Sequence, residues 1–202
     1  MKLFYSPGAC SLSPHIALRE AGLAFELVQT STKTKLLPDG SDYRAINPKG
    51  QVPALLLDDG ELLTEGPVIV QYVADQAPQS GLLPAAGTMA RYRVLEWLNY
   101  ISTELHKSFG PLFNPAFPEE GKTFNKAALT QRLAWVDEQL AGRTYLTGDT
   151  FTVADGYLFV VVNWTKFVGL DITGLAHLGA FMGSVAARPA VQAALQAEGL
   201  LK

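Results

Sequence analysis

The sequence has 202 residues, which suffices for one large domain or two small ones with a sizeable core. Apolar residues make up 48% and charged residues 17%, a globular rather than a disordered composition. The net charge of −3 gives no electrostatic footprint for nucleic acid or an anionic membrane. One cysteine cannot form an internal disulfide, and the longest apolar stretch, residues 158–170, is interrupted by Asn163 and Lys166. We therefore expect a soluble, cytoplasmic protein without nucleic-acid or membrane partners.

The first part of the chain, residues 1–79, alternates short strand-like runs with helices. A helix with Pro14 in its first turn follows the first run, and Asp59-Gly60 between two apolar runs is a hairpin signal. The expected order is β-α-β-loop-β-β-α. The expected strands are residues 2–5, residues 24–29 and two within 51–66, and the expected helices begin near Ser11 and at Gly66.

Residues 80–87 contain turn residues and are expected to be a linker, and residues 88–202 are typical of helix throughout. Apolar residues spaced by three or four predict one long helix: Val94, Leu98, Ile101, Leu105, Phe109 and Leu112. Further helices are expected over 127–140, 153–167 and about 175–196. Thr152 and Asp155 fit a capping box at the start of one of them.

Three segments resemble the soluble glutathione transferases: FYSPGACSLSPHIALRE, NPKGQVPALLLDDGELLTEG and GDTFTVADGYLF. Cys10, together with ELHKSF at 104–109, is similar to the bacterial beta class in particular. The resemblance spans essentially the whole chain. It implies an α/β, thioredoxin-like N-terminal domain over 1–79, an all-α C-terminal domain over 88–202, and a homodimer.

The resemblance implies that the first domain binds glutathione. A cis peptide at Val52-Pro53 would turn the backbone of Val52 towards the ligand's cysteinyl residue. Glu65 would pair with the ligand's ammonium, while the N–H of Gly66 at a helix N-terminus would hold its γ-glutamyl carboxylate. Lys35 would bind the glycyl carboxylate. A solvated loop lysine is the alternative interpretation, and the nearby Lys33 could substitute.

Cys10 is the candidate for the thiol end of the site. A cysteine just before a helix has its thiolate stabilised by the helix dipole, and such placements lower the pKa from about 8.5 to roughly 3.5–7.5. A lone cysteine is otherwise a small buried hydrophobe. Tyr5 ends the first strand, and a nearby tyrosine activates glutathione in other transferase classes. Here we expect Tyr5 to be a core residue and Cys10 to act on the glutathione thiol instead.

Asn99, Thr103 and His106 are spaced four and three apart, which places them on one stripe of an ideal helix. By resemblance this stripe faces either the glutathione sulfur or the site of a dimer partner, and His106 is the catalytic candidate nearest the thiol. Which chain each residue serves stays open. The binding positions carried over are Asn99, Thr103, Glu104, Leu105 and His106.

An apolar co-substrate is expected to contact aromatic side chains: Tyr5, Phe109, Phe113, Trp164 and Phe167. Aromatics at helical spacing are also typical of plain core. The three histidines and one cysteine show no metal-ligand spacing, so we expect no metal and no tightly bound cofactor, with glutathione as co-substrate.

Three functions are therefore open. The first is conjugation of the glutathione thiolate to small electrophiles, typical of detoxification. The second is thiol-disulfide or peroxide chemistry through a mixed disulfide at Cys10, since C-x-x-S lacks a resolving thiol. The third is a non-enzymatic transferase-like module. The joint presence of Cys10, Val52-Pro53 and Glu65 favours an enzyme.

Overall fold

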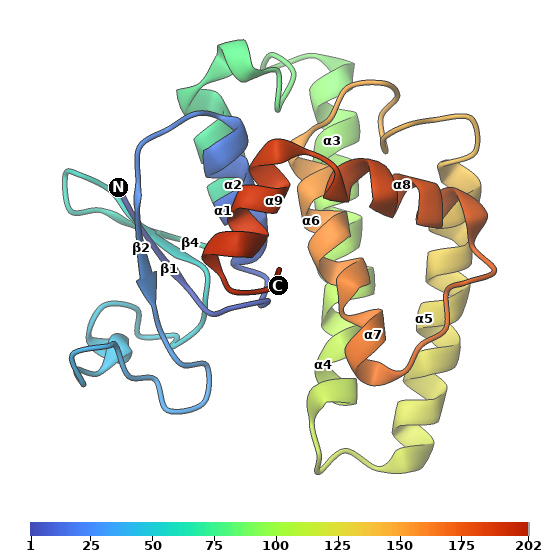
Figure 1. Ribbon diagram of the computed structural model, residues 1–202, viewed down its shortest axis with the longest axis horizontal. Helices are drawn as coiled ribbons and strands as arrows, with labels where there is room; N and C mark the ends of the chain where they lie inside the picture. The colour runs from blue at the N-terminus through green and yellow to red at the C-terminus, as the bar shows by residue number, and fades with distance from the viewer. Residues whose placement is uncertain (202) are drawn as a thin grey trace. The chain divides into compact units, whose positions relative to one another are not determined.

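The computed structural model describes residues 1–201 and divides the chain into two compact units (Figure 1). The first unit comprises Met1–Leu83 together with the segment from Arg188 onward, and the second is Pro84–Ala187. The boundary at residue 83 lies inside the predicted linker. The end of the chain groups with the first unit, which differs from the expected helical domain over 88–202.

The first unit is built on a four-stranded mixed sheet in the order β2-β1-β3-β4. Strands β1 (Lys2–Tyr5) and β2 (Glu26–Gln29) are parallel, with Leu3 opposite Leu27. Strands β3 (Ala54–Leu56) and β4 (Leu62–Thr64) form an antiparallel hairpin, and β3 also pairs antiparallel to β1. Gly60 turns the hairpin with φ +92°, which a side chain would disfavour. The predicted element order is confirmed.

Three helices complete this unit: α1 (Leu12–Glu20), α2 (Gly66–Gln76) and α9 (Pro189–Ala197). Helix α1 packs against both α2 and α9. Arg188, just before α9, binds the carboxylate of Glu20 at the end of α1 with bonds of 2.6 and 2.8 Å. These contacts explain why the last helix belongs to the first unit, although 168 residues separate the two charges.

Side chains alternate between the two faces of the sheet, so each face has its own layer of core. Phe4 of β1 contacts Tyr43 of the 3-10 turn η1 (Tyr43–Ala45), with ring centroids 5.4 Å apart, and Ala54 of β3 joins them. Leu3 and Leu55 point to the opposite face and are fully buried. A second 3-10 turn, η2 (Pro78–Ser80), follows α2.

The second unit is helical. Helix α3 (Met89–Tyr100), the π-helical turn η3 (Ile101–His106) and α4 (Lys107–Phe113) follow without interruption, as the apolar periodicity predicted. They are followed by α5 (Glu119–Gln139), α6 (Val153–Asn163), α7 (Thr165–Val168) and α8 (Ala176–Ala186). Helix α5 begins earlier than expected, and the helix expected over 153–167 divides at Trp164.

The predicted capping box at the start of α6 is confirmed. The Asp155 carboxylate accepts hydrogen bonds from the Thr152 amide at 2.7 Å, the Thr152 hydroxyl at 2.8 Å and the Leu146 amide at 2.8 Å. Burial raises the pKa of Asp155 to about 6 despite these bonds. Among residues 1–201, no helix is both long and apolar enough to cross a bilayer.

Candidate functional site

The loop between β1 and α1 carries Cys10, which lies two residues before the first residue of α1 and is partly exposed. Its thiol Sγ lies 3.2 Å from the carbonyl oxygen of Val52 and donates to it. The Val52-Pro53 peptide is cis, as the resemblance implied. The thiol and the backbone expected to bind the cysteinyl part of glutathione are therefore direct neighbours.

The start of α2 adjoins the same segment. A Cβ placed on Gly66 would lie 3.7 Å from the Pro53 ring, so these two residues are neighbours. Glu65 precedes Gly66 with φ +70°, a conformation that side-chain-bearing residues rarely adopt. The first N–H groups of a helix have no acceptor within the helix. In α2 the N–H of Gly66 is one of these groups, whereas Pro67 has no N–H. Backbone donors and an acid thus stand beside the cis proline.

The Glu65 carboxylate is exposed and already binds an ammonium group. Lys49 Nζ lies 2.6 Å from its oxygen and 3.0 Å from the Thr64 hydroxyl. The side chains of this ion pair are 52% and 63% exposed, so water screens their attraction and a competing cation can displace Lys49.

The two candidate lysines of the loop after β2 lie in different surroundings. The stem of Lys35 passes within 3.5 and 3.6 Å of the Cβ position at Gly50, close in sequence to Val52. Lys33 instead lines a shallow pocket of about 570 Å³ together with Ser6 and the residues that follow β2. Lys35 is therefore the lysine beside the segment that precedes the cis proline.

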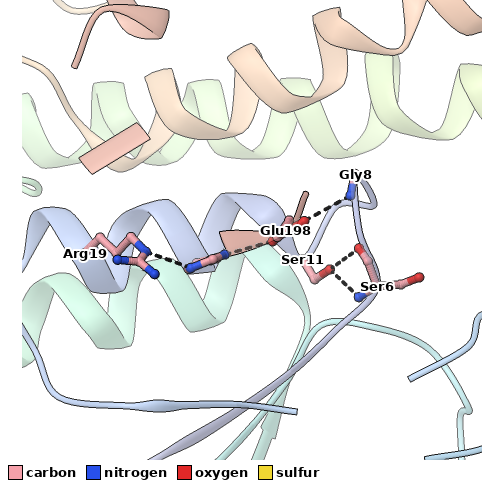
Figure 2. A network of polar contacts seen from close by, with 6 residues as sticks. Ser6, Gly8, Ser11, Arg19 and Glu198 are labelled. Atoms are coloured by element: carbon pink, nitrogen blue, oxygen red, sulfur yellow. Dashed lines mark hydrogen bonds and ion pairs between the residues drawn. The ribbon is translucent and has the colours of Figure 1, made fainter. Parts of the chain in front are cut away.

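A partly buried polar network, which no sequence pattern predicted, supports the Cys10 loop (Figure 2). Glu198, just after α9, accepts hydrogen bonds from the Gly8 amide at 3.0 Å and from His15 Nδ1 at 2.8 Å. Arg19 Nε donates to the other His15 nitrogen at 2.8 Å, which makes Nδ1 the protonated nitrogen. The Ser11 hydroxyl binds the backbone of Ser6, which closes the same loop. No local sequence signal connects Glu198 to position 15, which lies 183 residues earlier.

Tyr5 is buried at the end of β1, with its ring 6.3 Å from that of His15. Burial, and secondarily the charge of Glu198, raise the pKa of its hydroxyl above the usual value. The environment therefore disfavours a tyrosinate. This agrees with Tyr5 as a core residue rather than a thiol activator.

In the second unit, the turn η3 separates residues that an ideal helix would align. A π-helix bonds residue i to i+5, and each added residue rotates the following side chains by about 100°. Asn99 and Thr103 are exposed, whereas Leu105 is buried and His106 faces an aromatic cluster. Glu104 is ion-paired with Arg132 at 3.0 Å. The expectation of one stripe through Asn99, Thr103 and His106 is wrong, because it assumed 3.6 residues per turn.

His106 contacts Tyr157, a residue that the sequence analysis missed. Its Nδ1 lies 2.6 Å from the Tyr157 hydroxyl oxygen, and its ring stands edge-on to Trp164 at 4.8 Å. Burial, with a smaller contribution from the charge of Lys107, lowers the pKa of His106 to about 4. The imidazole is therefore neutral at pH 7.

Three of the expected co-substrate residues form one cluster in this unit. Phe109 is stacked on Phe113 at 6.2 Å, and Trp164 stands edge-on to both, at 5.6 and 6.0 Å. Phe113 is 49% exposed, so the cluster reaches the surface. Phe167 is 74% exposed and makes no ring contact with a described residue. Across residues 1–201, no three His, Cys, Asp or Glu side chains gather in a way that could hold a metal ion.

Comparisons with known proteins identify the family of this chain. Residues 8–76 match the model of the glutathione S-transferase N-terminal domain, and residues 125–197 match that of the C-terminal domain. The glutathione S-transferase GstA of Escherichia coli O157:H7 is 55% identical over 200 residues, covering 99% of this chain and 100% of the relative.

Solved structures agree as well. A beta-class glutathione S-transferase of Sphingomonas chungbukensis is 48% identical with a TM-score of 0.96, and the match covers both chains in full. A sphingomonad glutathione S-transferase complexed with glutathione is 51% identical with a TM-score of 0.95, covering 99% of this chain and 100% of that one. The chain is therefore an enzyme of the glutathione S-transferase family, similar throughout its length to the bacterial beta class.

Proposed function

We propose that this transferase joins the glutathione thiolate to small, largely apolar electrophiles. In the reaction, the sulfur forms a bond to an electrophilic carbon while the leaving group departs with its electron pair. The observation that carries the proposal is the contact between Cys10 Sγ and the Val52 carbonyl, 3.2 Å apart, beside a helix start that bears Glu65. These residues offer partners to the thiol, the peptide and the γ-glutamyl end of one ligand.

Each charged group of glutathione has a proposed partner. The backbone of Val52 pairs with the cysteinyl amide, and the Gly66 N–H with the γ-glutamyl carboxylate. The ligand's ammonium replaces Lys49 on Glu65, an exchange of one cation for another in an exposed pair. Lys35 binds the glycyl carboxylate.

The other candidates are assigned by chemistry. Cys10 and His106 serve the glutathione thiol as catalytic residues. Phe113, with Phe109 and Trp164 packed against it, contacts the apolar co-substrate, because Phe113 makes this aromatic cluster partly open to solvent. Phe167 and Tyr5 are weaker candidates, since neither belongs to this cluster. Conjugation of this kind removes reactive electrophiles from the cell.

Calorimetry with glutathione tests the binding proposal directly. We expect saturable binding by the parent and a loss of about 10–100-fold in affinity for Glu65→Gln, because charge-assisted hydrogen bonds contribute about 1.5–3 kcal/mol. Absence of glutathione binding by the folded parent would refute the proposal.

A second activity is proposed because Cys10 is the only cysteine and its thiol is partly exposed. Its thiolate attacks the glutathionyl sulfur of a disulfide between glutathione and another thiol, forms a mixed disulfide with glutathione and releases that other thiolate. A glutathione thiolate then attacks the mixed disulfide, which restores the Cys10 thiolate and forms glutathione disulfide. Mass spectrometry after exposure to glutathione disulfide checks this step, and an unmodified Cys10 argues against it.

The variant Cys10→Ala separates the two activities. Loss of disulfide exchange with surviving conjugation would show that Cys10 bonds to glutathione without being needed to activate its sulfur. Loss of both would make Cys10 the activator.

We also propose a homodimer in which Asn99, Thr103, Glu104 and Leu105 serve the glutathione site of the same or the partner copy. Asn99 and Thr103 are exposed on one side of α3 and η3, so they are available to a second chain. Light scattering should give twice the chain mass, and a monomer would contradict the proposal. A cytoplasmic location is proposed because that compartment keeps a single thiol reduced.

A further inference from the structure

The hydrogen bond between Tyr157 and His106 has a direction that the chemistry of the two groups favours. The Tyr157 hydroxyl oxygen lies 2.6 Å from His106 Nδ1. A phenol is a stronger acid than a neutral imidazole, whose unprotonated nitrogen is a good acceptor. This difference in acidity favours Tyr157 as the donor and Nδ1 as the acceptor.

The direction of this bond fixes which nitrogen of the ring carries the proton. A neutral imidazole has one N–H, and if Nδ1 accepts, the proton resides on Nε2. We propose that Tyr157 is a positioning residue that holds His106 in the Nε2–H tautomer, so that the ring offers a hydrogen-bond donor at Nε2. Nε2 has no hydrogen-bond partner within residues 1–201. Ser13 Oγ is the only buried side-chain nitrogen or oxygen without a hydrogen-bond partner among these residues, so Nε2 is not buried. The donor is thus open to solvent or a ligand.

The surroundings keep the ring in this orientation. Trp164 contacts the imidazole with centroids 4.8 Å apart and planes at 67°, and the Tyr157 ring lies at 5.9 Å and 82°. Tyr157 is buried in α6, two residues after the Asp155 carboxylate that caps the helix start. His106 is the last residue of η3, whose extra residue per turn rotates the side chain away from the exposed Asn99. Both partners are therefore held by packed helices rather than by loops.

This inference rests on the proposed role of His106 towards the glutathione thiol. A neutral N–H can donate to a thiolate and stabilise it without giving up its proton. With the proton on Nδ1 instead, Nε2 would present a lone pair to the sulfur anion, and the two would repel. Tyr157 would thereby favour the anionic form of the ligand's sulfur.

Nitrogen-15 NMR of the histidine-labelled protein tests the tautomer directly. The chain has three histidines, and His106→Gln identifies the signals of interest by their loss. We expect a protonated Nε2 and an unprotonated Nδ1 in the parent, and a mixture of the two tautomers in Tyr157→Phe. The exposed Tyr92→Phe removes a phenol hydroxyl from the same unit and should leave the signals unchanged. A parent with the proton on Nδ1, or a tautomer unaffected in Tyr157→Phe, overturns the inference.

Kinetics test the consequence. Tyr157→Phe should lower kcat about tenfold and leave the KM for glutathione within about twofold, since the bond to Nδ1 acts on the sulfur and not on ligand binding. In a His106→Gln background, the same substitution should cause no further loss, because Tyr157 acts through His106. An undiminished tenfold loss in that background would contradict a positioning role. Failure of the parent to bind glutathione refutes the proposed function, whereas the NMR result decides the tautomer independently.

Discussion

Glu198 is the residue whose removal tests most directly how the end of the chain supports the Cys10 loop. Its carboxylate is fully buried and accepts from two donors, the Gly8 amide at 3.0 Å and His15 Nδ1 at 2.8 Å. The bond from Arg19 to the opposite side of the His15 ring prevents the histidine from simply switching tautomers. Glu198→Ala therefore removes the acceptor of both hydrogen bonds.

The size of the effect follows from those two donors. A buried polar group left without its partner costs about 1–3 kcal/mol. The His15 bond is buried and the Gly8 bond partly exposed, so Glu198→Ala should lower the free energy of unfolding by about 2–4 kcal/mol. Glu198→Gln retains one acceptor oxygen and should lose about half as much. Glu138→Ala removes a carboxylate from an exposed position of α5 and should change the free energy of unfolding by less than about 0.5 kcal/mol.

Urea unfolding followed by circular dichroism measures the change, and amide hydrogen exchange at Gly8 locates it. The second unit contains all three tryptophans, Trp97, Trp135 and Trp164, so tryptophan fluorescence measures the unfolding of that unit. A loss below about 1 kcal/mol in Glu198→Ala, with unchanged exchange at Gly8, would refute the reasoning. It would mean that water or a shifted side chain replaces the carboxylate.

Three further predictions follow from the site and its supports. Lys49→Met should change stability by less than about 1 kcal/mol because the ion pair is exposed, and should leave glutathione affinity within about threefold, whereas calorimetry should show the larger loss for Glu65→Gln. Asp155→Ala removes the acceptor of two backbone amides and one hydroxyl and should lower the free energy of unfolding by about 2–5 kcal/mol in urea, with the exposed Asp149→Ala as control; equal midpoints would contradict it. The pKa of His106 is lowered to about 4 from 6.5, so the folded protein binds fewer protons than the unfolded chain, and the contribution of His106 is lost as the pH falls from 6.5 towards 4. The free energy of unfolding contributed by His106 is therefore about 2–3 kcal/mol lower at pH 4.5 than at pH 7. The raised pKa of Asp155 acts in the opposite sense, so the measured quantity is the difference in pH dependence between the parent and His106→Gln, and identical curves would contradict the assignment.

The sequence was sufficient for features that depend on local pattern. The strand and helix order of the first unit follows from short apolar runs, the Asp59-Gly60 turn and Pro14 in the first turn of a helix, and the structure has the same order. The capping box is also local, since Thr152 and Asp155 are three residues apart. The cis peptide at Val52-Pro53 came from the family resemblance, because no local physical rule selects it.

Features that depend on tertiary contacts could not be predicted in this way. The π-helical turn η3 breaks the 3.6-residue period on which the stripe through Asn99, Thr103 and His106 was based. Tyr157 lies 51 residues from His106, and nothing near either residue signals their hydrogen bond. The grouping of α9 with the first unit has the same origin, because it depends on contacts between the two ends of the chain.

The dependence of the Cys10 loop on Glu198 also bears on how the protein is made. Synthesis proceeds from the N-terminus, so the strands and helices of residues 1–83 leave the ribosome long before Glu198 is added. Until then the Gly8 amide and His15 Nδ1 lack their acceptor, and α1 lacks the helix that packs on it. The Cys10 loop can therefore make its final contacts only after the segment that carries Glu198 has been synthesised.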